Sequence, residues 1–408
     1  MKQTEAECSR TPPSVIKDIC VCTFSCTKYI VMNILELSLL GDACQLKADS
    51  IKFRCKLNFG AEQKMKRVVV TGAAGFIGSN FTKHLLQSRS DVSIICIDSL
   101  TYAGNLDNLK DEIKDSRLIF YKADILNKRE IFEIFSRENP DTVINFAAES
   151  HVDRSIKDPE IFMNTNVIGV QNLLEACREY PVERFHQIST DEVYGDLTLD
   201  SHGKLFSENS ILAPSGVYSA SKASADLLAL SYCKTYGIPV TVSRGANTYG
   251  PNQYPEKLIP LMIYRAKKNE SLPLYGKGIN VRDWISVKDH CRGIEAVAER
   301  GRAGEIYNIG CECEIDNITL VKRILDILGK PYSLIEFVED RKGHDLRYAM
   351  DNTKAQKETG WKALDDFDET FEKTVKWYTE NKDWSEKIFS GEYLNLYKTD
   401  YSEYVLSV

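Results

Sequence analysis

Two short segments hold residue types that could perform acid–base chemistry, and the first is "STDEVYG" (189–195). It places the hydroxyl of Thr190 beside the carboxyl groups of Asp191 and Glu192, directly after the apolar run "RFHQIS" (184–189). Neighbouring carboxyl groups tend to titrate apart, so that one keeps its proton near neutral pH while the other stays ionised. An acid–base couple needs this difference. A solvated loop is the alternative, and it would be the default without Thr190 and the flanking "VYG".

The second segment is "YSASK" (218–222), which puts Tyr218 and Lys222 one helical turn apart on the same face. An ammonium group near a phenol favours its ionised form, and the phenolate could take a proton from a sugar hydroxyl while a hydride leaves for a nicotinamide. The same spacing recurs in two pairs that we interpret as surface pairs on helices, Tyr264/Lys268 and Tyr378/Lys382.

One geometric condition must hold for the two acids to share a substrate. Successive residues on a strand point to opposite faces, so Asp191 and Glu192 can act together only if the backbone turns where the strand ends. We predict such a turn.

A glycine-rich segment predicts a dinucleotide site. "TGAAGFIG" (71–78) places Gly72, Gly75 and Gly78 after an apolar run and at the start of a helical pattern, as a pyrophosphate-binding turn requires. Asp98 ends the next apolar run, where it could accept hydrogen bonds from a ribose, and no arginine follows in "DSLTYAGN" to bind a 2′-phosphate. NAD is therefore favoured over NADP. A tight turn without a ligand is the alternative.

The elements that position these residues form an alternating pattern. Strand-like runs occur at 67–71, 92–98, 117–121, 141–148, 184–189 and 239–244, with amphipathic segments between them. Runs without a polar face indicate a sheet covered on both sides, so we predict an α/β fold with a doubly wound parallel sheet and a smaller C-terminal domain. A further strand is expected at 305–310, with helices at 317–329 and 366–381.

Composition bears on the domain organisation. The chain has 408 residues, 43% of them apolar, which is enough for two buried cores. We expect an N-terminal extension outside the working fold (1–64), an NAD-binding domain (65–250 with about 283–311), a substrate domain (251–282 with 312–392) and a C-terminal tail (393–408).

Charge and hydropathy limit the classes of partner. The net charge is −7 and the basic residues are scattered, so no nucleic-acid partner is expected. No run approaches the roughly 18 to 20 apolar residues of a membrane span. Free thiols in a reducing cytoplasm are the simplest interpretation of the cysteines. "CVCTFSC" (20–26) matches no common zinc pattern, and no histidines form a metal-spaced pair, so no metal is predicted.

Several motifs together resemble the extended short-chain dehydrogenase/reductase family over about residues 66–377: "TGAAGFIG", "FAAESHVD", "STDEVYG", "YSASK" and "NTYGPNQYPEKLIP". With "RDWISV" and "DRKGHD", the Thr-Asp-Glu triplet most closely resembles the dTDP-glucose 4,6-dehydratases. The resemblance implies oxidation of the hexose at C4 by NAD, loss of water from C5 and C6, and return of the hydride to C6. It assigns Tyr218 as the base for the C4 hydroxyl, Glu192 as the base at C5 and Asp191 as the acid at C6.

The resemblance also implies binding residues. Those expected at the cofactor are Gly72, Gly75, Phe76, Ile77, Gly78, Asp98, Asp124, Ile125, Ala147, Tyr218 and Lys222. Those expected at the sugar nucleotide are Thr190, Asn247, Lys257, Leu258, Pro273, Tyr275, Arg282, Asn317, Arg341 and His344, and arginine suits its diphosphate. Alternatively, Arg282 forms a surface ion pair with Asp283, and Tyr275 belongs to the core. His151 is interpreted as a satisfied loop histidine, and neither it nor Arg154 is included in the catalytic set.

Family members usually form homodimers through two helices, which correspond here to residues 160–178 and 218–236. A 4-epimerase or decarboxylase on the same scaffold would also use Tyr218, Lys222 and NAD, but it has no need for two acids beside Thr190. A catalytically silent NAD-sensing protein would be expected to lack at least one of these groups, and all are present. The nucleotide stays open among dTDP, UDP and CDP.

Overall fold

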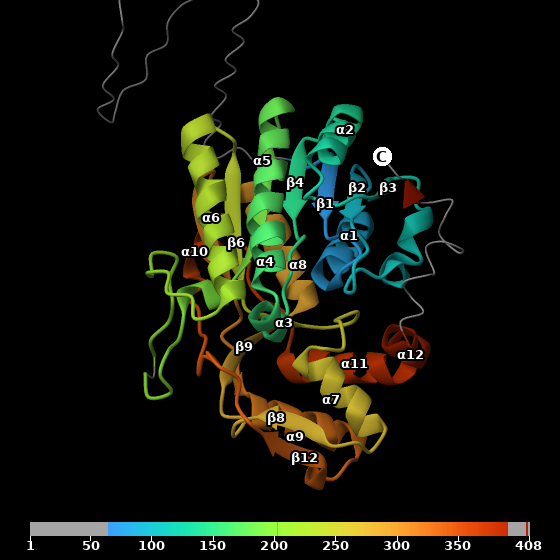
Figure 1. Ribbon diagram of the computed structural model, residues 1–408, viewed down its shortest axis with the longest axis vertical. Coiled ribbons are helices and arrows are strands. Elements are labelled where there is room, and N and C mark those ends of the chain that lie inside the picture. Colours follow the sequence, from blue (N-terminus) through green and yellow to red (C-terminus); the bar gives the residue numbers. More distant parts are fainter. Residues whose placement is uncertain (1–63, 202, 391–404, 407–408) are drawn as a thin grey trace, which may run out of the picture. The chain divides into compact units, whose positions relative to one another are not determined.

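Eight parallel strands form the main sheet of the computed structural model, which describes residues 64–201, 203–390 and 405–406 (Figure 1). The strand order is β10-β6-β5-β4-β1-β2-β3-β13. The strands are β1 (Arg67–Thr71), β2 (Ser93–Asp98), β3 (Leu118–Lys122), β4 (Thr142–Asn145), β5 (Arg184–Thr190), β6 (Val240–Gly245), β10 (Glu305–Ile309) and β13 (Val405–Leu406). The order from β3 to β6 is that of a doubly wound dinucleotide-binding sheet, so the predicted fold class is confirmed.

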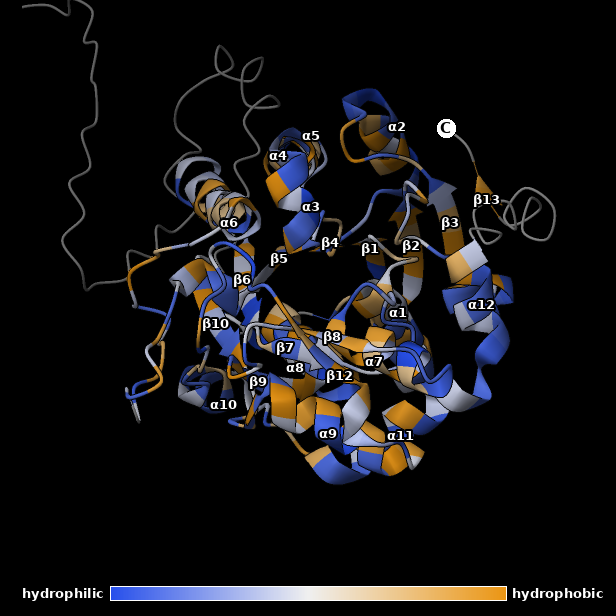
Figure 2. Cartoon of the chain, turned by 60° about the horizontal axis from the view of Figure 1, so that its bottom comes forward, coloured by the Kyte–Doolittle hydropathy of each residue, from blue (hydrophilic) through white to orange (hydrophobic). Residues whose placement is uncertain are grey.

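Helices cover both faces of this sheet because its strands are apolar on both sides. Val68 and Val70 pack with α1 (Phe76–Ser88) and α8 (Val287–Arg300), whereas Val69 points the other way. The second face is covered by α2 (Lys128–Glu138), α5 (Val170–Glu179) and α6 (Val217–Tyr236). In Figure 2, which colours residues by hydropathy, β2 and β3 carry mostly apolar residues, whereas α10 (Thr353–Thr359) carries mostly hydrophilic residues.

A continuous helical segment precedes β5. It consists of α4 (Pro159–Met163), a π-helical stretch (Asn164–Gly169) and α5. The helices expected at 160–178 and 218–236 are therefore present. The remaining short elements of this part are α3 (Val152–Lys157) and the 3-10 helices η3 (Leu106–Leu109), η4 (Glu112–Lys114) and η6 (Asp191–Tyr194).

The second, smaller part of the fold has its own core between helices and two small sheets. One sheet has the order β11-β9-β7 and the other pairs β12 with β8. Their strands are β7 (Asn247–Tyr249), β8 (Leu272–Tyr275), β9 (Val281–Ser286), β11 (Glu314–Asp316) and β12 (Ile335–Val338). The helices are α7 (Leu258–Lys267), α9 (Asn317–Leu328), α11 (Phe367–Glu380), α12 (Lys382–Ser390) and the 3-10 helix η7 (Tyr332–Leu334).

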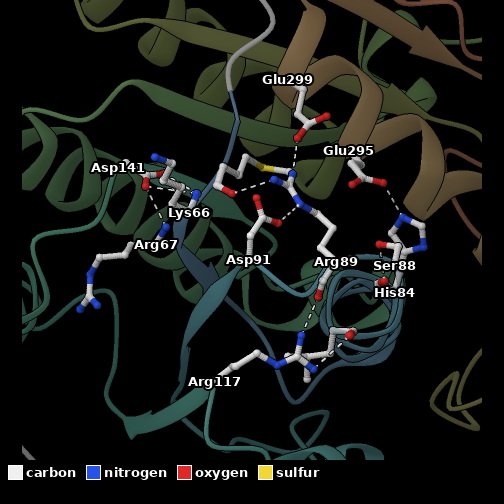
Figure 3. Close-up of polar contacts among 12 residues, drawn as sticks. Lys66, Arg67, His84, Ser88, Arg89, Asp91, Arg117, Asp141, Glu295 and Glu299 are labelled. Atoms are coloured by element: carbon white, nitrogen blue, oxygen red, sulfur yellow. Dashed lines mark hydrogen bonds and ion pairs between the residues drawn. The ribbon is translucent and has the colours of Figure 1, made fainter.

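A polar network closes the amino-terminal edge of the main sheet (Figure 3). The guanidinium of Arg89 at the end of α1 pairs with Glu299 of α8 and donates to the carbonyl of Met65 at 3.0 Å. His84 lies 2.6 Å from Glu295, which gives α1 and α8 a second polar contact. This network lies at the end of the strands opposite the cavity described below.

Some predictions fall outside the described residues. The cysteine segment 20–26 lies outside them entirely. Of the predicted N-terminal extension only Lys64 is described, and of the predicted tail (393–408) only the short strand β13 is described. In the part of the chain that the structure covers, no helix has the length and apolar character needed to cross a membrane.

Candidate active site

A cavity of about 430 Å³ lies at the carboxyl ends of the parallel strands. It is lined by residues that follow or end β1, β2, β4, β5 and β6, including Gly72, Asp98, Ala147, Thr190 and Gly245. Ligands of open α/β sheets bind at this edge, because neighbouring crossovers lead away in opposite directions and leave a crevice.

The glycine-rich segment forms the turn between β1 and α1 along this cavity. Gly72 has φ +63°, and a Cβ there would lie 2.8 Å from the backbone nitrogen of Ala147. At Gly78, a Cβ would lie 2.2 Å from the carbonyl oxygen of Gly72. The predicted cofactor residues Gly75, Phe76 and Ile77 also line the cavity, and the free N–H groups that begin α1 suit a diphosphate. The geometry thus fits a dinucleotide.

Asp98 ends β2 with its carboxylate held by the backbone. Its two oxygens accept hydrogen bonds from the N–H groups of Ala74 (2.9 Å) and Leu100 (2.8 Å). Burial raises the pKa of Asp98 to about 6, and these two hydrogen bonds oppose the rise. Asp98 lines the cavity together with Asp124 and Ile125, as expected for the adenosine end of NAD. Its contact with a ribose stays a prediction.

The backbone turns at the end of β5, as predicted. Thr190 is the last residue of β5 and the N-cap of η6, because its hydroxyl oxygen accepts from the N–H of Glu192 at 3.3 Å. The same hydroxyl donates to Oδ1 of Asp191 at 3.1 Å. Asp191 and Glu192 therefore lie in the first turn of η6, and both line the cavity.

The two acids have different electrostatic surroundings. Burial, followed by the charge of Glu192, raises the pKa of Asp191 to about 8. Its Oδ2 is buried and has no hydrogen-bond partner among the described residues. Burial also raises the pKa of Glu192, but the charges of Arg341, Lys257 and Arg282 oppose that rise. At neutral pH, Asp191 keeps its proton and is poised as an acid.

Tyr218 and Lys222 lie in the first turns of α6 and line the same cavity. Their electrostatics differ from the sequence-based expectation. The ammonium of Lys222 donates to the carbonyl of Ile188 at 2.6 Å, and burial lowers its pKa to about 8. Burial and the neighbouring carboxylates of Glu192 and Asp191 raise the pKa of Tyr218, which is opposite to the direction that the Tyr-x3-Lys spacing predicts. A hydrogen bond with Thr190 opposes this rise.

The other two pairs with this spacing differ from each other. Lys268 donates to the hydroxyl of Tyr264 in an exposed pair, as expected. The interpretation of Tyr378 as a surface residue is wrong, since only 3% of it is exposed and its hydroxyl donates to the carbonyls of Gly250 and Gln253. An apolar environment in the second core holds this ring.

Four of the residues predicted for the sugar nucleotide line the cavity: Thr190, Asn247, Lys257 and Leu258. The others, Pro273, Tyr275, Arg282, Asn317, Arg341 and His344, come from the smaller part of the fold and lie outside that lining. Among these, Arg282 and Arg341 act electrostatically on Glu192, and the rings of Tyr275 and His344 are 6.1 Å apart.

Both alternative interpretations for the nucleotide residues are contradicted. Arg282 is only 5% exposed and is not in a surface ion pair, because its guanidinium donates to the carbonyls of Asp345 and Leu346 and lies 4.2 Å from the ring centroid of Tyr348. Tyr275 is 38% exposed rather than in the core, and its hydroxyl donates to Asp153 at 3.0 Å.

The structure adds two residues that the sequence did not indicate, since the hydroxyl of Tyr102 donates to Glu256 at 3.1 Å beside the same cavity. The predicted Lys257 donates to the carbonyl of Ser150 at 2.7 Å. The interpretation of His151 as a satisfied histidine is wrong, because its Nδ1 is buried without a partner in the described part of the chain. Burial lowers the pKa of His151 to about 4, so it is neutral. Only the position of "ESHVDRS" after the fourth strand could have drawn attention to it.

The chain is similar to known proteins over most of its length. The family model described as GDP-mannose 4,6 dehydratase matches residues 69–374. A dTDP-glucose 4,6-dehydratase from Neisseria meningitidis is 45% identical over 349 residues, covering 81% of this chain and 98% of the relative. The crystal structure of a dTDP-glucose 4,6-dehydratase from Streptomyces venezuelae with NAD and TYD bound is 45% identical, with a TM-score of 0.76 and coverage of 79% and 99%. A UDP-glucose 4-epimerase from Thermotoga maritima is 30% identical, with a TM-score of 0.71 and coverage of 78% and 99%.

Proposed function

The chain belongs to the dTDP-glucose 4,6-dehydratase family, and from this premise we propose that it converts dTDP-glucose to dTDP-4-keto-6-deoxyglucose with NAD as its cofactor. One observation carries the proposal. A buried acid that keeps its proton, Asp191, lies beside a second carboxyl group surrounded by cations, Glu192, in the cavity that also contains Tyr218. Simple oxidation or epimerisation at C4 requires no such pair.

Each group has a defined task. Tyr218 is the base for the C4 hydroxyl; to take that proton it must first release its own, which burial and the neighbouring carboxyl groups oppose and the hydrogen bond with Thr190 favours. The resulting ketone acidifies the neighbouring C5–H, and Glu192 removes that proton. Asp191 gives its proton to the C6 hydroxyl, which leaves as water. General acid–base catalysis of this kind contributes about 10²- to 10⁴-fold to a rate.

We propose that the turn after β1 and the carboxylate of Asp98 hold the cofactor. The turn at Gly72, Gly75 and Gly78 leaves room for a diphosphate at the start of α1, and Asp98 offers its carboxylate to a ribose. When bound, NAD supplies the acceptor for the hydride from C4 and the donor for its return to C6. Because the cycle is redox-neutral, the same NAD serves successive turnovers.

We further propose that the smaller part of the fold binds the nucleotide. Arg282 and Arg341 suit the diphosphate, while Pro273 and Tyr275 flank the base and His344 lies against Tyr275. Asn247, Asn317, Lys257 and Leu258 complete the contacts. In this proposal, residues 65–250 with about 283–311 bind NAD, and residues 251–282 with 312–392 bind the sugar nucleotide.

The test is incubation with dTDP-glucose and with UDP-glucose separately. Formation of a 4-keto-6-deoxy product is followed by mass spectrometry, and deuterium at C4 should migrate to C6. The dehydratase proposal fails if Asp191→Asn and Glu192→Gln both retain full dehydration. Binding of dTDP-glucose without migration of its deuterium from C4 to C6 would instead indicate a catalytically silent NAD-binding protein.

We also propose a homodimer formed through the α4–α5 segment and α6. Apolar side chains are exposed on these helices, including Met163 (43%), Ile168 (45%) and Leu227 (60%). A cytoplasmic location is proposed as well, in keeping with the described cysteines, all of which are free. Fractionation of cells that produce the protein would test the location.

A further inference from the structure

A buried ion pair lies behind the catalytic residues and takes no part in the proposed reaction. Asp226 follows Lys222 by one turn of α6 and is 0% exposed, and Arg244 of β6 is 1% exposed. The Nε of Arg244 donates to Oδ2 of Asp226 at 3.0 Å. The hydroxyl of Ser189, the residue before Thr190, donates to the same oxygen at 2.9 Å. One carboxylate thus joins α6 to β5 and β6.

The pair also reaches the helix that carries the two acids. The guanidinium carbon of Arg244 lies 4.7 Å from the ring centroid of Tyr194, the last residue of η6. The hydroxyl of Tyr194 donates to Asn308 of β10 at 2.7 Å, which fixes the far end of that ring. Arg244 therefore contacts both α6, through Asp226, and η6, through Tyr194.

The charge of Asp226 acts on Lys222 as well. Burial lowers the pKa of Lys222, and the carboxylate of Asp226 raises it. The ammonium of Lys222 donates its hydrogen bond to the carbonyl of Ile188 on β5. The titratable groups around Tyr218 are Glu192 and Asp191 of η6 together with Asp226 itself, and the negative charge of each raises the pKa of Tyr218.

Net stabilisation is a weak explanation for this pair. Removing two charges from water costs about as much as their attraction returns, so an apolar pair of similar size is often as stable. The field of a buried charge on a neighbouring group is, by contrast, strong because little water screens it.

We propose that Asp226, held by Arg244, is a positioning residue of the active site, which keeps the ammonium of Lys222 charged beside Tyr218 and holds α6 and η6 in a fixed relation. The inference rests on the proposed roles of Tyr218 and Lys222. It explains how the redox residues of one helix and the acid–base residues of another are aligned on one sugar ring.

The first test is Asp226→Asn, which removes the charge and keeps the size. We expect kcat to fall about 10- to 100-fold, at most the lower end of a general acid–base contribution, because Asp226 acts through Lys222, with KM within about twofold. The alkaline limb of the C4 oxidation step, followed as the formation of reduced NAD rather than as the dehydration that also depends on the Asp191 proton, should move to lower pH by about one unit, because Lys222 loses its proton earlier without a neighbouring carboxylate. Asp226→Glu keeps the charge, so the alkaline limb of its pH profile should lie at the same pH as in the wild type even if kcat falls.

A matched control and a second variant keep the test decisive. Glu299→Gln removes the carboxylate of the partly buried Arg89 ion pair in Figure 3, and should leave kcat and the pH profile unchanged. If Asp226→Asn does not fold because Arg244 is left unpaired, the double variant Asp226→Asn/Arg244→Gln removes both charges and should show the same shift of the limb.

Competitive acetylation of Lys222, followed by mass spectrometry over a range of pH, measures its pKa without relying on turnover. A lower pKa in the Asp226→Asn protein supports the inference even if dTDP-glucose is not the substrate. An unchanged Lys222 pKa together with an unmoved alkaline limb overturns it.

Discussion

At the scale of single residues, the site depends on two neighbouring carboxyl groups whose surroundings differ. Burial raises the pKa of Asp191 to about 8, whereas cations oppose the corresponding rise at Glu192. Asp191 must hold its proton to release the C6 hydroxyl as water. We therefore expect the rate of dehydration to fall as pH rises through about 8. Measuring kcat for the wild type and for Asp191→Glu across this range would check the assignment.

Asp191→Asn should separate the chemical steps. The amide is not an acid, so dehydration should slow by about 10²- to 10⁴-fold, while oxidation at C4 continues and reduced NAD accumulates, as its absorbance would show. Rapid product formation without reduced NAD would contradict the assignment of Asp191 as the acid.

The same substitution should also change stability. The folded-state pKa of Asp191 lies above the unfolded value, so the free energy of unfolding declines between about pH 4 and pH 8, because in this window the unfolded chain has lost the proton that the folded protein still holds. Asn has no such dependence. The Tm of the variant relative to the wild type should therefore increase across this window, as differential scanning calorimetry can measure. A Tm difference that does not vary with pH would contradict the assigned burial.

The sequence predicted these reactive residues better than it predicted their partners. Thr190, Asp191, Glu192 and Tyr218 stand in compact motifs, and the turn after β5 followed from the need for both acids to face one substrate. The predicted direction of the Tyr218 pKa shift is wrong, because burial and the two neighbouring carboxyl groups raise the pKa of the phenol while Lys222 donates to a backbone carbonyl. That balance depends on depth in the fold, and no spacing encodes it.

At the scale of elements, the turn between β1 and α1 has no room for a side chain at Gly78. A Cβ at Gly78 would lie 2.2 Å from the backbone oxygen of Gly72, so Gly78→Ala must displace the turn and the start of α1. We expect the purified variant to contain less than a tenth of the wild-type NAD, since tenfold weaker binding corresponds to only about 1.4 kcal/mol. NAD content can be measured after denaturation.

Gly237→Ala is the control for this prediction. Gly237 ends α6 with φ +74° and has open space around its Cβ position, so alanine there strains the backbone without a clash. It should lower stability by about 1 kcal/mol and leave NAD content unchanged. Equal loss of NAD in both variants would show that the turn has no special role.

Periodicity predicted the elements well because the main sheet is apolar on both faces. The predicted strands and the two predicted C-terminal helices all form. The largest difference is at β4, which ends at Asn145 although its apolar run continues to Ala148. There the N–H of Ala147 turns to the hydroxyl of Thr71 at 3.2 Å, and the chain leaves the sheet to line the cavity. Hydropathy cannot distinguish a strand from such an exit.

At the scale of the whole molecule, helices on one face of the sheet expose apolar side chains. Met163 and Ile168 lie on the continuous helical segment that runs from α4 to α5, and Leu227 lies on α6. This segment and α6 contact each other. Such residues mark an association surface when several lie on neighbouring elements. A symmetric pair of molecules would bring two helical segments from each against one another.

Leu227→Asp should therefore convert a dimer to a monomer, because it places a charge where 60% of an apolar side chain is exposed in the single chain. Leu364→Asp is the matched control, since Leu364 is 64% exposed but lies between α10 and α11. Light scattering after gel filtration gives the mass of each. A monomeric wild type, or a dimer that survives Leu227→Asp and dissociates with Leu364→Asp, would place the association surface elsewhere. Because α6 carries Tyr218 and Lys222, we expect the monomeric variant also to lose part of its activity.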